Sequence, residues 1–264
     1  MKKIMLVAVA LVAMSAAPAL AADLPARSYS KAPAIVPMVS SWTGCYVGGN
    51  IGYGSQRNRT TDVDPSNAGF FSDVGSDTGS GVVGGGQVGC DYQFAGNWVV
   101  GIQGMFDGAD VKGSHIDPFA YSGDTSEYHS AKADWFGTLT ARLGYAVTPD
   151  TLLYVKGGAA WVHETFIDAD PVATGGLPVY SGQATTARTG WTVGGGGEYK
   201  FSMNWSVFVE YDYIGLGSKT SGYSYNCGAA CGFPNPYLYS DRNDFQTVLV
   251  GLNYRFGGPV VAKY

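Results

Sequence analysis

The stretch GWTVGGGGEYKFSMNWSVFVEYDY at Gly190–Tyr213 contains two segments in which apolar and polar residues alternate, on either side of a short break. Successive side chains of a strand point to opposite faces, so this period of two predicts two strands joined by a turn at Ser202–Asn204. The charged residues of both strands share one parity: Glu198, Lys200, Glu210 and Asp212. The opposite parity, which includes Val193 and Val209, carries no charge. The stretch therefore predicts an antiparallel hairpin with one apolar face and one charged face.

Eight segments of the chain show this alternation: Trp42–Gly54, Gly81–Phe94, Asn97–Ala109, Lys132–Ala146, Thr151–Phe166, Arg188–Phe201, Trp205–Gly217 and Asp244–Phe256. One parity is free of charge and includes Val47, Ile51, Val88, Tyr92, Val100, Ile102, Leu139, Leu143, Val155, Ala159, Trp191, Val193, Val207, Val209, Val248, Val250 and Leu252. The other parity carries Asp91, Asp107, Asp134, Arg142, Lys156, Glu198, Lys200, Glu210, Asp212 and Arg255. A soluble barrel turns its apolar face inward. This apolar face is too complete, and the charges are too numerous, for the charged set to face water around a folded core.

The connections between these segments alternate strictly between short and long. Short turns fall at Ala95–Gly96, Val147–Asp150 and Ser202–Asn204, and long polar connections at Ser55–Ser80, Val111–Ala131, Ile167–Ala187 and Ser218–Asn243. Short periplasmic turns and long extracellular loops are the plan of an outer-membrane barrel. Such a barrel must close, because a lipid-exposed sheet edge would leave backbone groups unpaired. The predicted fold is an all-β, eight-stranded antiparallel transmembrane β-barrel of the outer membrane, with the charged parity inside.

Aromatic residues gather at the ends of the predicted strands. The six tryptophans are Trp42, which opens the first strand, Trp98 and Trp205 after short turns, and Trp135, Trp161 and Trp191 at the long-loop ends. The turn-side level also holds Tyr92, Phe94, Tyr145, Tyr199, Phe201, Tyr254 and Phe256. Amphipathic rings favour the membrane–water interfaces, so two aromatic girdles are predicted.

The N-terminal segment predicts that the chain is exported. Met1–Ala21 has a charged start, an apolar run too short to span a bilayer as a helix and a small-residue cleavage site, so it is predicted to be a signal peptide. Ala22–Ser41 is predicted to be a periplasmic linker, Trp42–Phe256 the barrel domain and Gly257–Tyr264 a C-terminal tail. The mature chain would carry 14 basic and 21 acidic residues, a net charge of −7, which argues against nucleic acid as a partner.

Glycine is abundant, 39 of 264 residues, and the runs Gly84–Gly86 and Gly194–Gly197 lie inside predicted strands. A phosphate-binding loop would need a following helix and a Gly-Lys-Ser/Thr sequence, and neither accompanies these runs. In a narrow barrel, glycine makes room for large neighbours and lets the strands coil.

Several stretches together resemble the small outer-membrane barrels of alphaproteobacteria that are described as porin-family or opacity-type surface antigens. They are WTGCYVGGNIGYG at Trp42–Gly54, GGQVGCDYQFAGNWVVGIQG at Gly85–Gly104, DWFGTLTARLGYAV at Asp134–Val147, LLYVKGGAAW at Leu152–Trp161, the opening stretch Gly190–Tyr213, and VLVGLNYRF at Val248–Phe256. The resemblance implies an abundant eight-stranded surface barrel and offers no catalytic residues. Such barrels usually end at a terminal aromatic that is read by the assembly machinery. Here either Phe256 is read internally or Tyr264 takes its place.

The predicted interior charges form the most functional-looking cluster. They are Asp91, Asp107, Arg142, Lys156, Glu198, Lys200, Glu210, Asp212 and Arg255. An eight-stranded barrel is about wide enough for its own side chains, and buried charges are costly unless they are paired. A salt-bridged plug is therefore the favoured interpretation, ahead of a selective ion path or a catalytic acid–base pair.

The histidines and loop acids offer weaker hypotheses. His115, His129 and His163 are expected mainly as surface polar residues, with a rim-sited hydrolase built on His163 or His115, or capture of a metal or haem, as alternatives. Asp62–Asp64 and Asp168–Asp170 do not have EF-hand spacing and are expected to be mostly solvated. No metal site and no cofactor are predicted.

Four cysteines in an exported chain suggest disulfides, because the periplasm is oxidising. Cys227 and Cys231 share the last long loop and are the favoured pair. Cys45 and Cys90 lie on adjacent strands in the outward set, so a cross-strand bond between them is the less favoured alternative to two lipid-facing apolar residues.

The predicted function is that of an outer-membrane surface protein with a structural, envelope-integrity role and exposed loops. A small passive porin is the alternative, and a rim-sited hydrolase is a distant third. The expected partners are outer-membrane lipid, lipopolysaccharide and the barrel-assembly machinery, while any loop ligand is unknown. The predicted location is the outer membrane of a Gram-negative bacterium.

Overall fold

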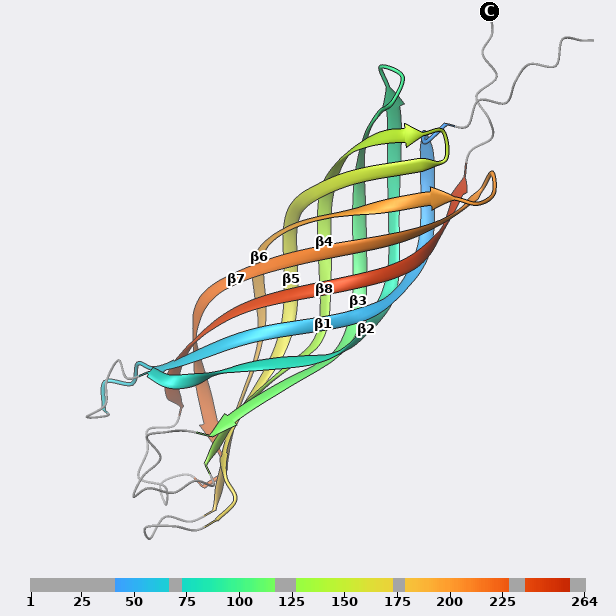
Figure 1. Ribbon diagram of the computed structural model, residues 1–264. Coiled ribbons are helices and arrows are strands. Elements are labelled where there is room, and N and C mark those ends of the chain that lie inside the picture. Colours follow the sequence, from blue (N-terminus) through green and yellow to red (C-terminus); the bar gives the residue numbers. More distant parts are fainter. Residues whose placement is uncertain (1–40, 67–72, 117–126, 173–178, 228–235, 257–264) are drawn as a thin grey trace, which may run out of the picture. The chain divides into compact units, whose positions relative to one another are not determined.

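Eight strands form a closed barrel in the computed structural model of the chain (Figure 1). The structure describes residues 41–66, 73–116, 127–172, 179–227 and 236–256. The strands are β1 Gly44–Asp62, β2 Asp73–Phe94, β3 Trp98–Ile116, β4 Tyr128–Thr148, β5 Thr151–Asp170, β6 Tyr180–Lys200, β7 Trp205–Tyr225 and β8 Tyr237–Phe256. Each strand pairs antiparallel with the next, and β8 pairs with β1. The predicted eight-stranded antiparallel barrel is confirmed. Among the described residues, no helix is long and apolar enough to cross a membrane.

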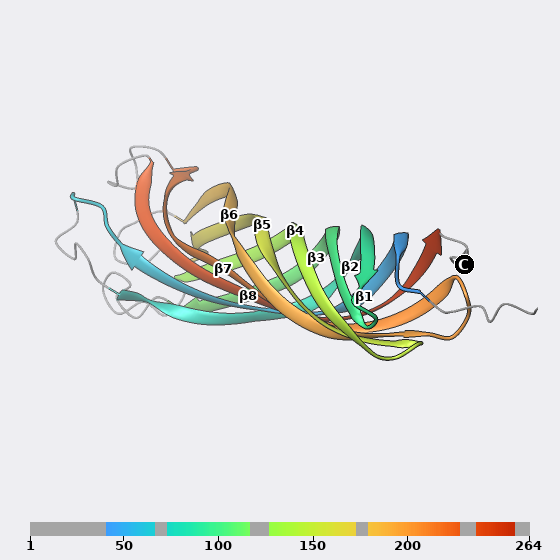
Figure 2. The same ribbon diagram turned by 90° about the horizontal axis from the view of Figure 1, so that it is seen from above.

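The three short turns, which follow β2, β4 and β6, lie at one end of the barrel together with the start of β1 and the end of β8 (Figures 1 and 2). The β2–β3 turn has positive φ at two residues, 45° at Ala95 and 79° at Gly96. The connection consists of the three residues Ala95–Asn97, because Phe94 pairs with Trp98, and tight hairpin turns commonly need such a left-handed backbone. In outer-membrane barrels the short turns face the periplasm, so this end is the periplasmic end.

At the opposite end the strands run far beyond their predicted limits. Each strand has 19 to 22 residues, about twice the 9–11 that cross a bilayer. The prediction of a loop over Ser55–Ser80 was wrong, because β1 continues to Asp62 and β2 begins at Asp73. The other three long connections shorten in the same way. Above the apolar band both faces of the wall are polar, so the hydrophobic alternation ends while the backbone ladder continues.

The outer surface carries the predicted lipid-facing band. The uncharged parity is exposed on the outside, as at Ile51, Ile102, Val155 and Val209. Aromatic pairs flank this band: Trp98–Tyr145 and Trp205–Tyr254 toward the turns, and Phe106–Trp135 and Trp191–Tyr213 toward the long connections.

Trp42 does not belong to this outer girdle. It is fully buried and packs with Val99, Leu152 and Tyr154 inside the periplasmic end of the barrel. The prediction that it opens β1 at the membrane surface was therefore wrong. The chain enters β1 from inside the barrel mouth, where an indole ring can cover the side chains above it.

Candidate functional site: the barrel interior

A compact charge network fills the periplasmic part of the interior. Arg142 of β4 reaches across to Glu198 of β6, with Nη2 2.9 Å from Oε2, and its Nη1 donates to the Tyr46 hydroxyl at 2.9 Å. Arg255 of β8 lies 2.9 Å from Asp91 and 3.5 Å from Glu198. Two arginines thus face two carboxylates. Because all of these side chains are buried, their mutual pairing offsets the cost of removing four charges from water.

The segment before β1 covers this network on the periplasmic side. Arg255 Nη1 donates to the Trp42 carbonyl at 2.8 Å, and Lys200 Nζ donates to the Ser41 carbonyl at 2.6 Å. The Lys200 ammonium also lies 4.0 Å from the centre of the Trp42 ring, a cation–π contact. These contacts fix the backbone at the barrel mouth and close the interior from below.

A second charge cluster lies one level further from the turns. Lys156 Nζ of β5 is 2.5 Å from Glu210 Oε1 and 3.1 Å from Asp212 Oδ2, both on β7. The Tyr154 hydroxyl donates to the other Glu210 oxygen at 2.7 Å. Asp107 of β3 is fully buried at about the same level. These residues tie together the walls of the barrel where the membrane lies outside.

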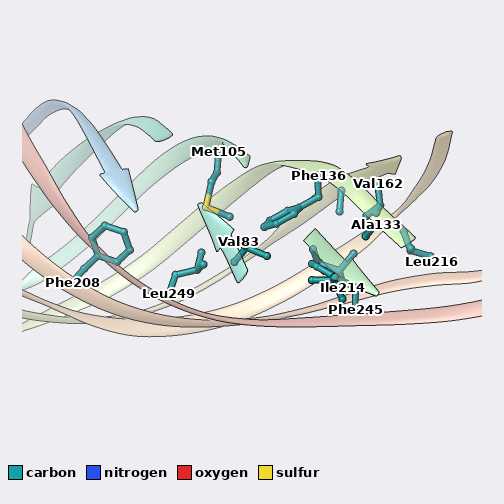
Figure 3. Packing of buried hydrophobic residues seen from close by; sticks show 12 residues of the cluster. Val83, Met105, Ala133, Phe136, Val162, Phe208, Ile214, Leu216, Phe245 and Leu249 are labelled. Carbon is teal, nitrogen blue, oxygen red and sulfur yellow. The ribbon is translucent and has the colours of Figure 1, made fainter. Parts of the chain in front are cut away.

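An apolar cluster runs through the interior and was not predicted. Figure 3 shows it as elongated, with Phe208 at one end and Leu216 at the other. Along β5, Ala160 and Val162 separate Lys156 from Glu164 and belong to this cluster. Phe136 of β4 and Phe245 of β8 are fully buried, and their ring centres are 5.3 Å apart. β4 and β8 lie four strands apart in a ring of eight, so this contact joins opposite walls.

Above this cluster the interior becomes polar again, and we call this side-chain-filled part of the barrel the extracellular chamber. Arg188 of β6 lies 3.4 Å from Glu164 of β5 and donates to the backbone carbonyls of Gly217 and Asp241 at 2.7 and 2.8 Å. The β6–β7 ladder is interrupted between Gln183 and Trp191. Arg188 bridges this interruption from inside, since it contacts β5, β7 and β8. Side-chain hydrogen bonds therefore hold the wall together where the backbone hydrogen bonds between β6 and β7 are interrupted.

The chamber is rich in tyrosine and buried acid. The rings of Phe166, Tyr180, Tyr223, Tyr225, Tyr237 and Tyr239 pack in one cluster. The buried carboxylates of this part of the chain are Asp62, Asp64, Asp77, Glu164, Asp168, Asp170 and Asp241. Just beyond β1, burial opposes the charge of Asp64, yet hydrogen bonds from Ser66 and from the Leu238 amide lower the pKa of its carboxyl.

The structure places all nine of the predicted interior charges inside the barrel. Asp91, Arg142, Glu198, Lys200 and Arg255 line the periplasmic network, and Asp107, Lys156, Glu210 and Asp212 the second cluster. Asp134, which shares their expected parity, faces outward instead, 2.7 Å from Lys132 and 3.4 Å from His163. A register shift between Ala133 and Trp135 explains this error, because one extra residue reverses the face to which a side chain points.

Other polar residues lie deeper than the sequence indicates. His129, Asp62, Asp64, Asp168 and Asp170 are buried in the extracellular chamber, so the expectation of solvated loop residues was wrong for them. Glu164, Arg188 and Asp241 were missed as interior charges. Glu164 and Arg188 lie in predicted strands at the parity of Lys156 and Glu198, a signal that could have found them. Asp241 lies in the predicted connection Ser218–Asn243, where no alternation marks a strand.

The cysteines Cys45 and Cys90 are directly opposite each other on β1 and β2, and a disulfide joins them on the outer face of the barrel. Cys227 is disulfide-bonded as well. Cys231, with which it was predicted to pair, lies outside the described residues, as do the predicted signal peptide, most of the linker and the C-terminal tail.

A closed antiparallel barrel with an apolar outer band and charges inside defines an outer-membrane β-barrel. The comparisons agree with this class. Residues 7–256 match the family described as "Outer membrane protein beta-barrel domain", and the chain belongs to this family. It is an outer-membrane protein of the kind found in Gram-negative bacteria.

Among its relatives is the 31 kDa outer-membrane immunogenic protein of Brucella melitensis biotype 1, which is 34% identical over 261 residues, covering 97% of this chain and 100% of that protein. An uncharacterized protein of Coxiella burnetii is 29% identical over 189 residues, 67% of this chain and 70% of that protein. Among solved structures, the outer membrane protease OmpT of Escherichia coli is similar, with a TM-score of 0.50 and 11% identity over 81% of this chain and 97% of that chain. At this identity the likeness concerns the fold alone. The chain is thus an outer-membrane barrel related to an outer-membrane immunogenic protein.

Proposed function

We propose that the protein is a sealed, non-enzymatic barrel that contributes to envelope integrity and presents its extracellular end at the cell surface. The observation that carries this proposal is the contact between Phe136 and Phe245 across the interior. Aromatic rings that meet from opposite walls occupy the interior between two charged clusters, and this opposes the passage of water and ions along the barrel. The kinship with an immunogenic outer-membrane protein supports the surface role.

A small passive porin is the competing function, and single-channel recording separates the two. The refolded full-length chain is inserted into a planar bilayer from a preparation free of other porins. A sealed barrel gives little or no steady conductance, with rare and small openings at most. Steady, frequent and ohmic channels in the wild type would contradict the proposal and favour the porin.

The rim-sited hydrolase finds less support. His163 pairs with Asp134 on the outer face of the wall, and His115 Nδ1 lies 3.1 Å from a buried Asp77 oxygen inside it. These two histidines thus lie on opposite faces of the barrel wall. A substrate at the chamber mouth would meet His115 from the inside but not His163, so the two do not contribute to one site.

Lipopolysaccharide is the proposed partner of the outer surface. Basic side chains project outward above the apolar band: Arg57, Arg59, Lys112, Lys132 and Arg242. Arg59 and Arg242 stand directly opposite each other on β1 and β8 and line a crevice of about 280 Å³ with Asp73 and Ser240. Asp73 forms an ion pair with Arg59, and a bound phosphate would add a second anion between the two arginines. During biogenesis, the terminal strand that ends at Phe256 would meet the assembly machinery.

A further inference from the structure

The extracellular chamber brings together three side chains that commonly bind metals. Glu127 precedes β4, His129 is the second residue of β4, and Asp168 lies near the end of β5. One potential ligand atom of each lies within 4.8 Å of the other two. His129 and Asp168 are directly opposite each other in the β4–β5 ladder, so the backbone register fixes their proximity.

The atoms around this group hold its carboxylates in place. The Tyr180 hydroxyl donates to Glu127 Oε1 at 2.6 Å. The hydroxyls of Tyr225 and Tyr239 both donate to Asp168 Oδ2. These bonds orient both carboxylates, and the other oxygen of Asp168, Oδ1, lies 3.6 Å from His129 Nε2. Outer groups that orient ligating carboxylates in this way are typical of metal sites.

The His129 ring is also held in place, by contacts with neighbouring rings. The His129 ring stacks on His115, with centres 5.5 Å apart, and meets the Tyr239 ring edge-on at 5.2 Å. The His129 and Asp168 side chains are almost completely buried, whereas Glu127 is only partly buried at the rim. An ion could thus enter past Glu127 and be held by the two inner ligands.

We propose that Glu127, His129 and Asp168 form a binding site for a divalent transition-metal ion of the zinc class at the extracellular mouth of the barrel. One imidazole nitrogen and two carboxylate oxygens suit zinc and its neighbours, and three protein ligands leave a position for water. Seven carboxylates are buried among the described residues of this half of the barrel, so a divalent ion would also lower the local negative charge. Bound metal would join the start of β4 to the end of β5.

The outer face of the same wall offers a matched control. His163 Nδ1 and Asp134 Oδ2 are 3.4 Å apart, so this pair has the same residue types at a similar spacing on the outside. The test uses the full-length protein, refolded in detergent and freed of metal with a chelator. Zinc binding is measured by isothermal titration calorimetry for the wild type, Glu127→Gln, His129→Ala, Asp168→Asn and the control His163→Ala. Cobalt absorption in the visible range reports whether an imidazole is a ligand.

We expect one zinc per chain in the wild type and in His163→Ala. Each site variant should bind more weakly by more than the roughly 10- to 100-fold that loss of an outer-shell partner costs. The cobalt spectrum should change in His129→Ala. Heat-modifiable mobility on gels shows which variants fold. If the buried substitutions prevent folding, Glu127→Gln at the rim decides the question. The proposal is overturned if the wild type binds no zinc at micromolar concentration, if Glu127→Gln binds as the wild type does, or if only His163→Ala loses the ion.

Discussion

Replacing Phe245 by alanine tests whether the interior of the barrel is packed or open. The Phe245 side chain is fully buried within the apolar cluster. Substitution of a buried phenylalanine by alanine costs about 3–5 kcal/mol, the sum of lost apolar transfer energy and the cavity left behind. Phe245→Ala should therefore lower the free energy of unfolding by about this amount, and Phe136→Ala on the opposite wall by a similar amount.

The two substitutions should not be additive, because the rings contact each other. Aromatic pairs at such separations contribute about 0.5–1.5 kcal/mol beyond their burial. The double variant should thus lose less stability than the two single losses combined, by about that interaction energy. Urea titrations of the protein in lipid vesicles, followed by tryptophan fluorescence, measure the free energies of unfolding of the wild type, the two single variants and the double variant. Together these four values form a double-mutant cycle.

The same variants connect packing with conduction. The double variant Phe136→Ala with Phe245→Ala should show brief channel openings that the wild type lacks. Replacing Arg142, Lys156, Glu210 and Asp212 together by alanine should loosen both charge clusters but leave the apolar contact in place, so it should raise conductance less. Losses below about 1 kcal/mol for both single variants would refute the packed interior, since a fully buried phenylalanine cannot be removed so cheaply.

Two further predictions concern the outer face. Val209→Arg should destabilise the barrel by about 2–4 kcal/mol if the residue lies near the bilayer midplane, whereas Thr185→Arg above the apolar band should cost only about 0–1 kcal/mol. Unfolding titrations in lipid compare the two, and equal costs would contradict the assigned membrane position. Reducing the disulfide between Cys45 and Cys90 should cost up to about 4 kcal/mol by the chain-entropy account, because it closes a separation of 45 residues. Mass spectrometry after alkylation without reductant should find both thiols blocked, and free thiols would rule out the bond.

The membrane-embedded half of the barrel could be predicted from the sequence because lipid outside and a narrow interior impose opposite demands on successive residues. Val209 must be apolar, and Glu210 can carry a charge only because Lys156 and Tyr154 meet it inside. Such a contrast marks both the strand and its face. The prediction failed at Asp134, where one extra residue shifts the register between Ala133 and Trp135. The amino-acid composition of the segment does not reveal that such a residue has been inserted.

The extracellular half could not be predicted in the same way. Around Arg59 and Asp168 both faces of the wall carry polar residues, so the chain reads as a loop although the ladder continues. The disulfide between Cys45 and Cys90 depends on register as well. The two residues face each other only because β1 and β2 pair at that offset, and sequence spacing alone does not determine it.

The interior also explains why glycine is so abundant. A side chain added at Gly251 would place its Cβ 2.5 Å from the Phe208 ring, and one at Gly89 would lie equally close to the Tyr46 ring. Large inward side chains are thus accommodated where the neighbouring strand has a glycine directly opposite, in line with the predicted role of glycine in making room for large neighbours. Because this complementarity fills the barrel from the Trp42 end up to Phe136 and Phe245, little room remains for a solute path through the membrane. The proposed metal site lies instead in the extracellular chamber beyond the apolar cluster, where Glu127 is partly exposed.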